Sequence, residues 1–188
     1  MAPRPTLSGS VAFHVPPDRI WRKNSADAYV EKAAIDYQGL YLHDNRVLFA
    51  AMIDGTEVLE SALPADEPGV AVREIELGPH DGSIWMCIAA SDGIELTDDR
   101  RQAAWKDRQG TPRTANLSGA GPGIRMEKVG SNVLLRCPKS ATASSARLRY
   151  WQPDAKTDAS VDTATAKLAI TPLPPELVKL KAPGGRRW

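Results

Sequence analysis

The sequence predicts a mostly β protein: a β-sandwich or barrel-like domain with one or two short helices and extended, proline-rich arms at both ends. The first observation is a succession of short apolar runs, several with two-residue alternation, bounded by glycine, asparagine or aspartate. The second is the composition, 42% hydrophobic and 25% charged, which is close to that of folded soluble domains. The third is the placement of proline, because the first 17 and the last 17 residues together hold eight of the 15 prolines.

We therefore divide the 188 residues into three parts. Residues 1–17 are predicted to form an N-terminal arm, 18–171 a β-rich globular domain, and 172–188 a C-terminal arm. A chain of this length can bury one sizeable core. The alternative for the arms is a pair of disordered tails, which is a common state of chain termini.

Turn residues between apolar runs predict two hairpins. The first joins residues 39–43 to 46–53 across an Asp-Asn turn. The second joins residues 124–129 to 133–137 across a Gly-Ser-Asn turn. Both turns contain residues that tolerate the backbone angles of a tight reversal.

Three further strands follow from the alternation of side chains. Residues 82–89 are apolar on both faces, which is typical of a central strand covered on two sides. Residues 146–151 place Leu148 and Tyr150 on one face and arginines with Trp151 on the other. A last strand is expected over residues 164–171.

Two stretches have the pattern of short helices. Ser25 is a candidate N-cap for a helix ending at Gln38, with Gly39 as its stop signal. Thr97 is a candidate N-cap for a helix over residues 98–109, with acidic residues in its first turn.

The two cysteines, Cys87 and Cys137, lie 50 residues apart in apolar runs. Two cysteines without nearby histidines make neither a disulfide scaffold nor a four-ligand zinc site. Pairing across two sheets would resemble an immunoglobulin domain, but the tyrosine expected two residues before the second cysteine is Leu135 here. We expect two buried free thiols.

Charge is divided between two segments of the chain. Residues 24–99 hold three basic and 16 acidic residues, a net of −13, whereas residues 100–152 hold 11 basic and two acidic residues, a net of +9. The two blocks could neutralise each other within one molecule, or an acidic face of one copy could meet a basic face of the next. The third interpretation is nucleic-acid binding by the basic segment, which we rank last because no nucleic-acid-binding motif is present.

No motif specifies a reaction, a metal or a cofactor. The three histidines, His14, His43 and His80, are too far apart in sequence for a metal-binding motif. The run from His80 to Ser83 contains the residue types of a serine triad, but such sites are defined by geometry and not by proximity in sequence. We predict no catalytic, cofactor-binding or metal site.

Arginines next to tryptophans, and aromatics in or beside the proline-rich arms, are the candidate interface residues, because such side chains dominate the energetics of protein interfaces. They are Trp21, Arg147, Arg149, Trp151, Arg186, Arg187 and Trp188. For the tryptophans near the arms, packing onto their own domain is the equal alternative.

The leading hypothesis is a non-catalytic structural or assembly subunit that binds copies of itself or other proteins through its arms and opposed charged faces. Capsid and tail components of bacteriophage virions need such features, and a virion role is part of this hypothesis. One alternative is a small ligand- or carbohydrate-binding β module with Trp151 or Trp105 as a stacking platform. A second is a hydrolase that uses His80. Because no apolar segment follows the first charged residue, we expect synthesis in the cytoplasm without Sec export and no membrane partner.

Overall fold

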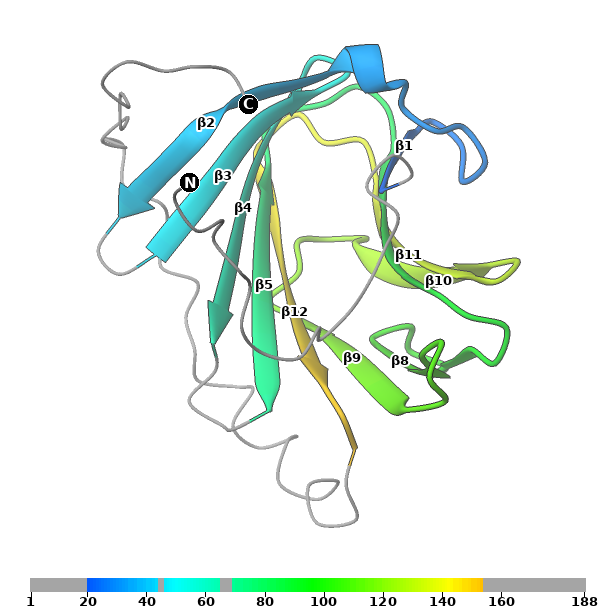
Figure 1. The fold of residues 1–188 in the computed structure, drawn as a ribbon. Coiled ribbons are helices and arrows are strands. Elements are labelled where there is room, and N and C mark those ends of the chain that lie inside the picture. The colour runs from blue at the N-terminus through cyan, green and yellow to red at the C-terminus, as the bar shows by residue number, and fades with distance from the viewer. Residues whose placement is uncertain (1–19, 44–45, 65–68, 154–188) are drawn as a thin grey trace, which may run out of the picture.

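The computed structural model describes residues 20–43, 46–64 and 69–153, and Figure 1 shows them as two antiparallel sheets. The small sheet contains, in spatial order, β1 (Trp21–Lys23), β6 (Ile84–Ala90), β11 (Asn132–Cys137) and β10 (Arg125–Val129). The large sheet contains β2 (Ile35–His43), β3 (Arg46–Ile53), β4 (Thr56–Pro64), β5 (Val70–Leu77), β12 (Ser144–Trp151), β9 (Pro112–Ser118), β8 (Gln102–Lys106) and β7 (Glu95–Leu96). The predicted mostly β, sandwich-like fold is confirmed.

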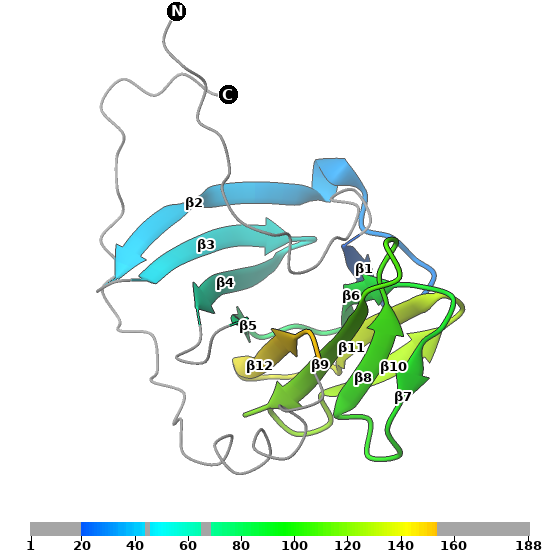
Figure 2. The ribbon, with the colours of Figure 1, turned by 60° about the horizontal axis from the view of Figure 1, so that its bottom comes forward.

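The main core lies between the two sheets. It is built from the inner faces, that is, the faces that the sheets turn toward each other (Figure 2). Its fully buried members include Met86 and Ile88 of β6, Leu135 of β11 and Leu148 of β12. In the strands that line this core, side chains that enter it alternate with side chains that point away from it, as the pleat of a β-strand requires.

The small sheet is anchored by β6, the strand that the sequence predicted to be covered on both faces. Ile84, Met86 and Ile88 belong to the core between the sheets, whereas Trp85 and Cys87 form a second cluster with Leu134 on the outer face. Every residue of β6 except the last is buried. The prediction of a central strand is thus confirmed.

Both predicted hairpins are present. β2 pairs with β3, and β10 pairs with β11 in a register that places Val129 opposite Asn132. Gly130 has a φ of 57°, the left-handed conformation that the tight turn between these strands requires. The strand predicted over residues 146–151 forms β12 together with the two residues before it, and β12 pairs with both β5 and β9.

The first predicted helix, over residues 25–38, is wrong. Only a three-residue 3-10 turn, η2 (Lys32–Ala34), forms there, and β2 begins immediately after it. The Ser25 hydroxyl accepts a hydrogen bond from the Asp27 amide within a local turn. Pairing of Ile35 with Ile53 in the sheet outweighs the weak helical periodicity, because tertiary contacts override local propensity.

The second predicted helix, over residues 98–109, is also wrong. Thr97 and Asp99 cap a turn, in which the Thr97 hydroxyl oxygen accepts from the Gln102 amide and Asp99 accepts from the Arg101 amide. β8 follows, with Ala103 and Trp105 buried at alternate positions. The same residue types cap turns and helices. Thr97 and Asp99 do bind backbone amides, but they do so in a turn and not at the start of a helix.

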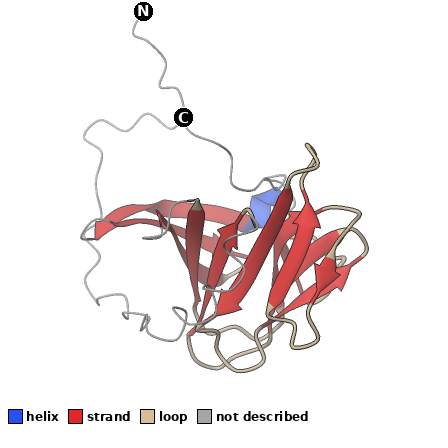
Figure 3. Ribbon diagram, turned by 90° about the horizontal axis from the view of Figure 1, so that it is seen from below, coloured by secondary structure: helices blue, strands red, loops and turns tan. Residues whose placement is uncertain are grey.

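Other predictions lie outside the described residues. These are the strand over residues 164–171, the two arms and the domain boundaries at residues 17/18 and 171/172. Across the part of the chain that the structure describes, no helix is long and apolar enough to cross a membrane. Figure 3 shows strands and loops throughout this part, apart from the short 3-10 turn η2.

Candidate functional site

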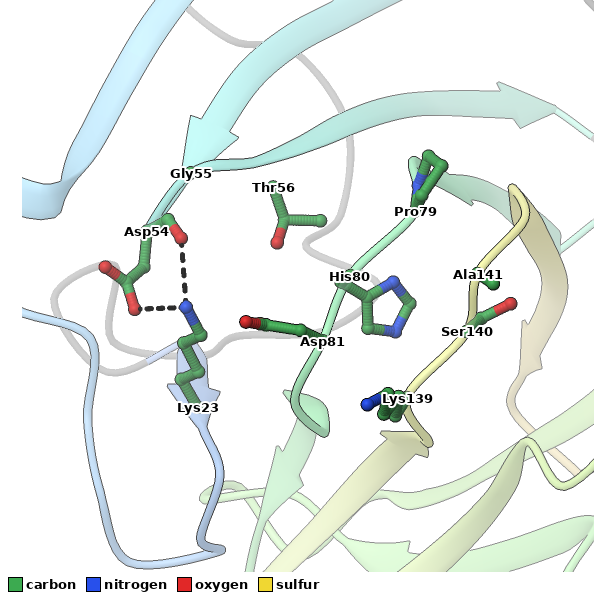
Figure 4. Close-up of a pocket in the computed structure, with 10 residues that line it drawn as sticks. All are labelled: Lys23, Asp54, Gly55, Thr56, Pro79, His80, Asp81, Lys139, Ser140 and Ala141. Atoms are coloured by element: carbon green, nitrogen blue, oxygen red, sulfur yellow. Dashed lines mark hydrogen bonds and ion pairs between the residues drawn. The ribbon is translucent and has the colours of Figure 1, made fainter.

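A cleft of about 580 Å³ lies where the connections between the sheets meet (Figure 4). Four segments line it: the end of β1, the β3–β4 turn, the β5–β6 connection and the β11–β12 connection. Its charged side chains are Lys23, Asp54, Asp81 and Lys139. The Lys23 ammonium contacts Asp54 twice, at 3.1 Å from the backbone oxygen and 2.8 Å from the carboxylate.

His80 lies in the wall of this cleft and fastens two connections together. Its backbone exchanges two hydrogen bonds with Ser140, of 2.8 and 3.0 Å. Its ring nitrogens contact two backbone carbonyls, with Nδ1 at 2.8 Å from Gly78 and Nε2 at 2.9 Å from Pro138. The β5–β6 and β11–β12 connections are thereby held to each other where the chain passes between the sheets.

This geometry gives no support to the hydrolase alternative. A general base needs a nitrogen lone pair directed at the nucleophile, but both nitrogens of His80 face carbonyl oxygens. The nearby hydroxyl of Ser140 donates to the Thr142 carbonyl at 2.7 Å. Within the described ranges, no group of three or more histidine, cysteine or acidic side chains is arranged to hold a metal ion.

A second feature is an excess of positive charge on the outer face of the small sheet. Arg125 of β10 and Arg136 of β11 are direct cross-strand partners. The Oε1 atom of Glu127 lies 2.7 Å from Arg125, 3.5 Å from Arg136 and 3.9 Å from Arg100. Three guanidinium groups therefore share one carboxylate. We call Arg100, Arg125, Arg136 and Glu127 the arginine cluster.

One member of the arginine cluster, Arg136, stacks on the ring of Trp85. The Arg136 guanidinium lies 5.4 Å from the centre of the Trp85 ring. On the other side of Trp85, its β1 partner Arg22 is buried, stacks on Tyr29 and donates to the Ala26 carbonyl. A cation held over an aromatic ring loses little further freedom when it binds a partner.

The ion pairs show how the two charge blocks are arranged. Arg147 pairs with Glu74 and joins the basic segment to the acidic one. Arg73 instead pairs with Glu60 inside the acidic segment, and the arginine cluster lies inside the basic segment. These ion pairs therefore lie both between the two blocks and within each of them.

The predicted interface residues that the structure describes are buried. Trp21 packs in the core between the sheets, so its own domain takes up this aromatic side chain. Arg147, Arg149 and Trp151 are exposed by 8% or less. Trp105, the other proposed stacking platform, is 7% exposed and belongs to the core. The remaining candidates, Arg186, Arg187 and Trp188, lie outside the described residues.

Two exposed aromatics were not singled out from the sequence. Tyr37 and Phe49 are 60% and 44% exposed. They lie on the inner face of the large sheet, on adjacent strands, because Tyr37 pairs with Ala51 and Phe49 is two residues before Ala51 on the same face of β3. Tyr37 falls within the predicted helix that ends at Gln38, and a helix does not place Tyr37 on the same face as Ile35 as the strand does. Such a diagonal pair brings two aromatic rings within reach of each other.

Sequence reasoning also missed the arginine cluster, although a signal was present. The signal is the second hairpin, but its predicted three-residue turn, 130–132, would place Arg125 opposite Cys137. In the structure Asn132 belongs to β11, and the shorter turn places Arg125 opposite Arg136. Only Arg100 requires the tertiary structure, because its carbonyl accepts from the Met126 amide and places the turn before β8 next to β10.

The fold and these surfaces define a β-sandwich module with a charged outer face. No protein-family model matches the chain, and no curated protein matches it in sequence. Among solved structures, the chain is similar to a heparinase III with methylated lysines, at a TM-score of 0.51 and 12% identity over 73% of this chain. The match corresponds to 24% of the heparinase chain, so this chain spans about a quarter of that protein's length. At this level of identity, the likeness concerns the fold alone.

Proposed function

We propose that this chain is a non-catalytic assembly subunit that binds acidic protein surfaces through its arginine cluster. The observation that carries the proposal is the sharing of the single Glu127 carboxylate by three guanidinium groups. Two positive charges remain uncompensated within the cluster. Guanidinium groups bind carboxylates with paired, directional hydrogen bonds, so a protein surface rich in aspartate or glutamate is the fitting partner.

The exposure of the cluster suits binding. The side chains of Arg100 and Arg125 are 50% and 41% exposed, and that of Arg136 is 30% exposed, whereas Glu127 is largely covered. An exposed ion pair on its own contributes little stability, so the folded monomer does not need such a cluster. Several cations on one rigid face instead guide a charged partner and set its orientation.

Binding of immobilised poly-L-glutamate by the full chain tests this proposal. We expect binding that weakens as salt increases and that is lost when Arg125→Gln and Arg136→Gln are combined. The matched control is Arg108→Gln, which removes an exposed arginine from the β8–β9 turn and leaves the cluster intact. Equal binding by the double variant and the wild type would refute the role of the cluster.

A second candidate function, carbohydrate binding, is favoured by Tyr37 and Phe49. Exposed aromatic rings can stack on the apolar face of a sugar, and Glu60, the cross-strand partner of Phe49, forms a two-pronged ion pair with Arg73 beside them. The platform is then this pair and not Trp151 or Trp105, which are buried. Titration calorimetry with neutral oligosaccharides, comparing wild type with Tyr37→Ala, tests it. Absence of heat with every sugar, or binding unchanged in the variant, would exclude this platform.

A further inference from the structure

The large sheet carries an acidic surface that matches the arginine cluster. We propose that the arginine cluster of one copy binds an acidic row, formed by Asp36, Glu57 and Glu76, on the outer face of a second copy, so that the chains associate head to tail. This inference rests on the proposed function and names its partner.

The acidic row crosses neighbouring strands on the outer face of the large sheet. Asp36 of β2 is paired with Met52 of β3, which is paired with Glu57 of β4. Leu59, two residues after Glu57 on the same face of β4, is paired with Glu76 of β5. Since Met52 points away from the core member Ile53, the row faces outward.

The acidic row is not neutralised within the described part of the chain. There, no lysine or arginine lies within ion-pair distance of Glu57 or Glu76, and Asp36 accepts a hydrogen bond from the neutral Gln38 side chain. The pKa of Glu76 is raised, first by burial and then by the negative charge of Glu57. Two carboxylates held close together repel each other, and a cation that binds between them relieves this repulsion.

The two surfaces are opposite in charge, and in each of them two charged side chains lie on adjacent strands. Arg125 and Arg136 lie on adjacent strands, and so do Glu57 and Glu76. Neighbouring strands in any sheet are about 4.8 Å apart. Arg125 and Arg136 are directly opposite each other, whereas Glu57 and Glu76 are diagonal neighbours, so the long arginine side chains have to span this offset to reach both carboxylates.

The position of the two surfaces determines the type of assembly. The arginine cluster is on the outer face of the small sheet and the acidic row on the outer face of the large sheet, so the two point away from each other in one molecule. A copy bound through its acidic row still presents a free arginine cluster. Contacts of this heterologous kind continue into chains, or close into rings if the rotation permits.

A charge-swap experiment with the full chain tests this inference by sedimentation velocity. One variant combines Glu57→Arg with Glu76→Arg, and the other combines Arg125→Glu with Arg136→Glu. We expect the wild type to self-associate, each variant alone to remain monomeric, and an equimolar mixture to associate again, because opposite charges face each other at every contact of the mixture. Glu57→Gln with Glu76→Gln is the milder variant, and we expect it to lose self-association while remaining folded.

The outcomes separate this inference from the proposed function. If the wild type binds poly-L-glutamate through Arg125 and Arg136 but the acidic-row variants associate as the wild type does, the partner surface is wrong while the function stands. A mixture of the charge-swapped variants that stays monomeric also overturns the inference. If poly-L-glutamate binding does not depend on Arg125 and Arg136, the proposed function fails as well.

Discussion

Arg125 and Arg136 are direct cross-strand partners, and one oxygen of Glu127 lies 2.7 Å from the first and 3.5 Å from the second. Like charges directly opposite each other destabilise a pair of strands. The hairpin tolerates this repulsion because Glu127 lies on the same face, two residues from Arg125. The fold thus keeps a concentration of positive charge that its own stability does not require.

Glu127 should therefore stabilise the hairpin and weaken its attraction for acidic partners. We expect Glu127→Gln to lower the free energy of unfolding by about 1 kcal/mol, since it leaves the guanidinium groups uncompensated. The same variant should bind poly-L-glutamate more tightly than the wild type does. Urea unfolding and the binding assay check the two effects, and weaker binding by this variant would contradict our view of the cluster.

Glu76 should make stability depend on pH. Its pKa is raised in the folded chain by burial and by Glu57, so the folded state holds its proton more strongly than the unfolded state does. Ionisation of Glu76 therefore lowers the free energy of unfolding. This loss of stability is absent below the unfolded pKa of about 4.3 and grows as pH rises toward the higher folded pKa. We expect Glu76→Gln to unfold at a higher temperature than the wild type at neutral pH and at the same temperature in acid. A pH-independent difference would exclude this explanation.

His80 should contribute to stability and not to catalysis. Its ring contacts the Gly78 and Pro138 carbonyls while its backbone pairs with Ser140. Replacing the ring with a methyl group removes both side-chain contacts in a buried place, so we expect His80→Ala to lower the free energy of unfolding by about 1–3 kcal/mol. Asp81→Asn, an exposed change next to it, is the matched control. Equal urea midpoints for His80→Ala and the wild type would argue against the fastening role.

The two cysteines should resist modification in the folded chain. Cys87 lies on the outer face of the small sheet and Cys137 on the inner face, so they point to opposite sides and remain free. Burial raises the pKa of both thiols, that of Cys137 to about 12. Since the thiolate is the reactive form, a thiol reagent at pH 8 should label neither until urea unfolds the protein, when both react without a reductant. Rapid labelling of native Cys137 would contradict its placement in the core.

The strands that could be predicted from the sequence are those whose signals are local. The hairpin of β10 and β11 has apolar runs on both sides of a glycine-containing turn, and β6 has an uninterrupted apolar run. Each signal needs only residues close in sequence. Such signals gave the fold class and the free state of the cysteines.

The failures arose where one local signal fits two structures. Thr97 and Asp99 satisfy backbone amides in a turn before β8 just as they would at the start of a helix. Tyr37 falls within the predicted helix that ends at Gln38, whereas in the structure β2 pairs with β3 and its side chains alternate between the two faces of the sheet. Periodicity over a few residues does not distinguish these cases, because the deciding contacts lie in a distant strand.

The candidate site could be predicted only in part. The charge division between residues 24–99 and 100–152 is visible in the sequence, and it pointed to opposed charged faces. The residues chosen for the basic face, Arg147 and Arg149, are buried instead, and Arg147 is paired with Glu74 of the neighbouring strand β5. Which arginines are exposed depends on contacts between segments far apart in sequence, and local patterns do not show these contacts.

Assembly through opposed charged faces is tested most directly by the mass of the full chain in solution, measured by light scattering over a range of concentrations and salt. We predict species heavier than the 20.4 kDa monomer at low salt that increase with concentration and dissociate in about 1 M salt, where exposed charges are screened within a few ångströms. A mass of 20.4 kDa at every concentration and salt level would contradict self-assembly through these faces.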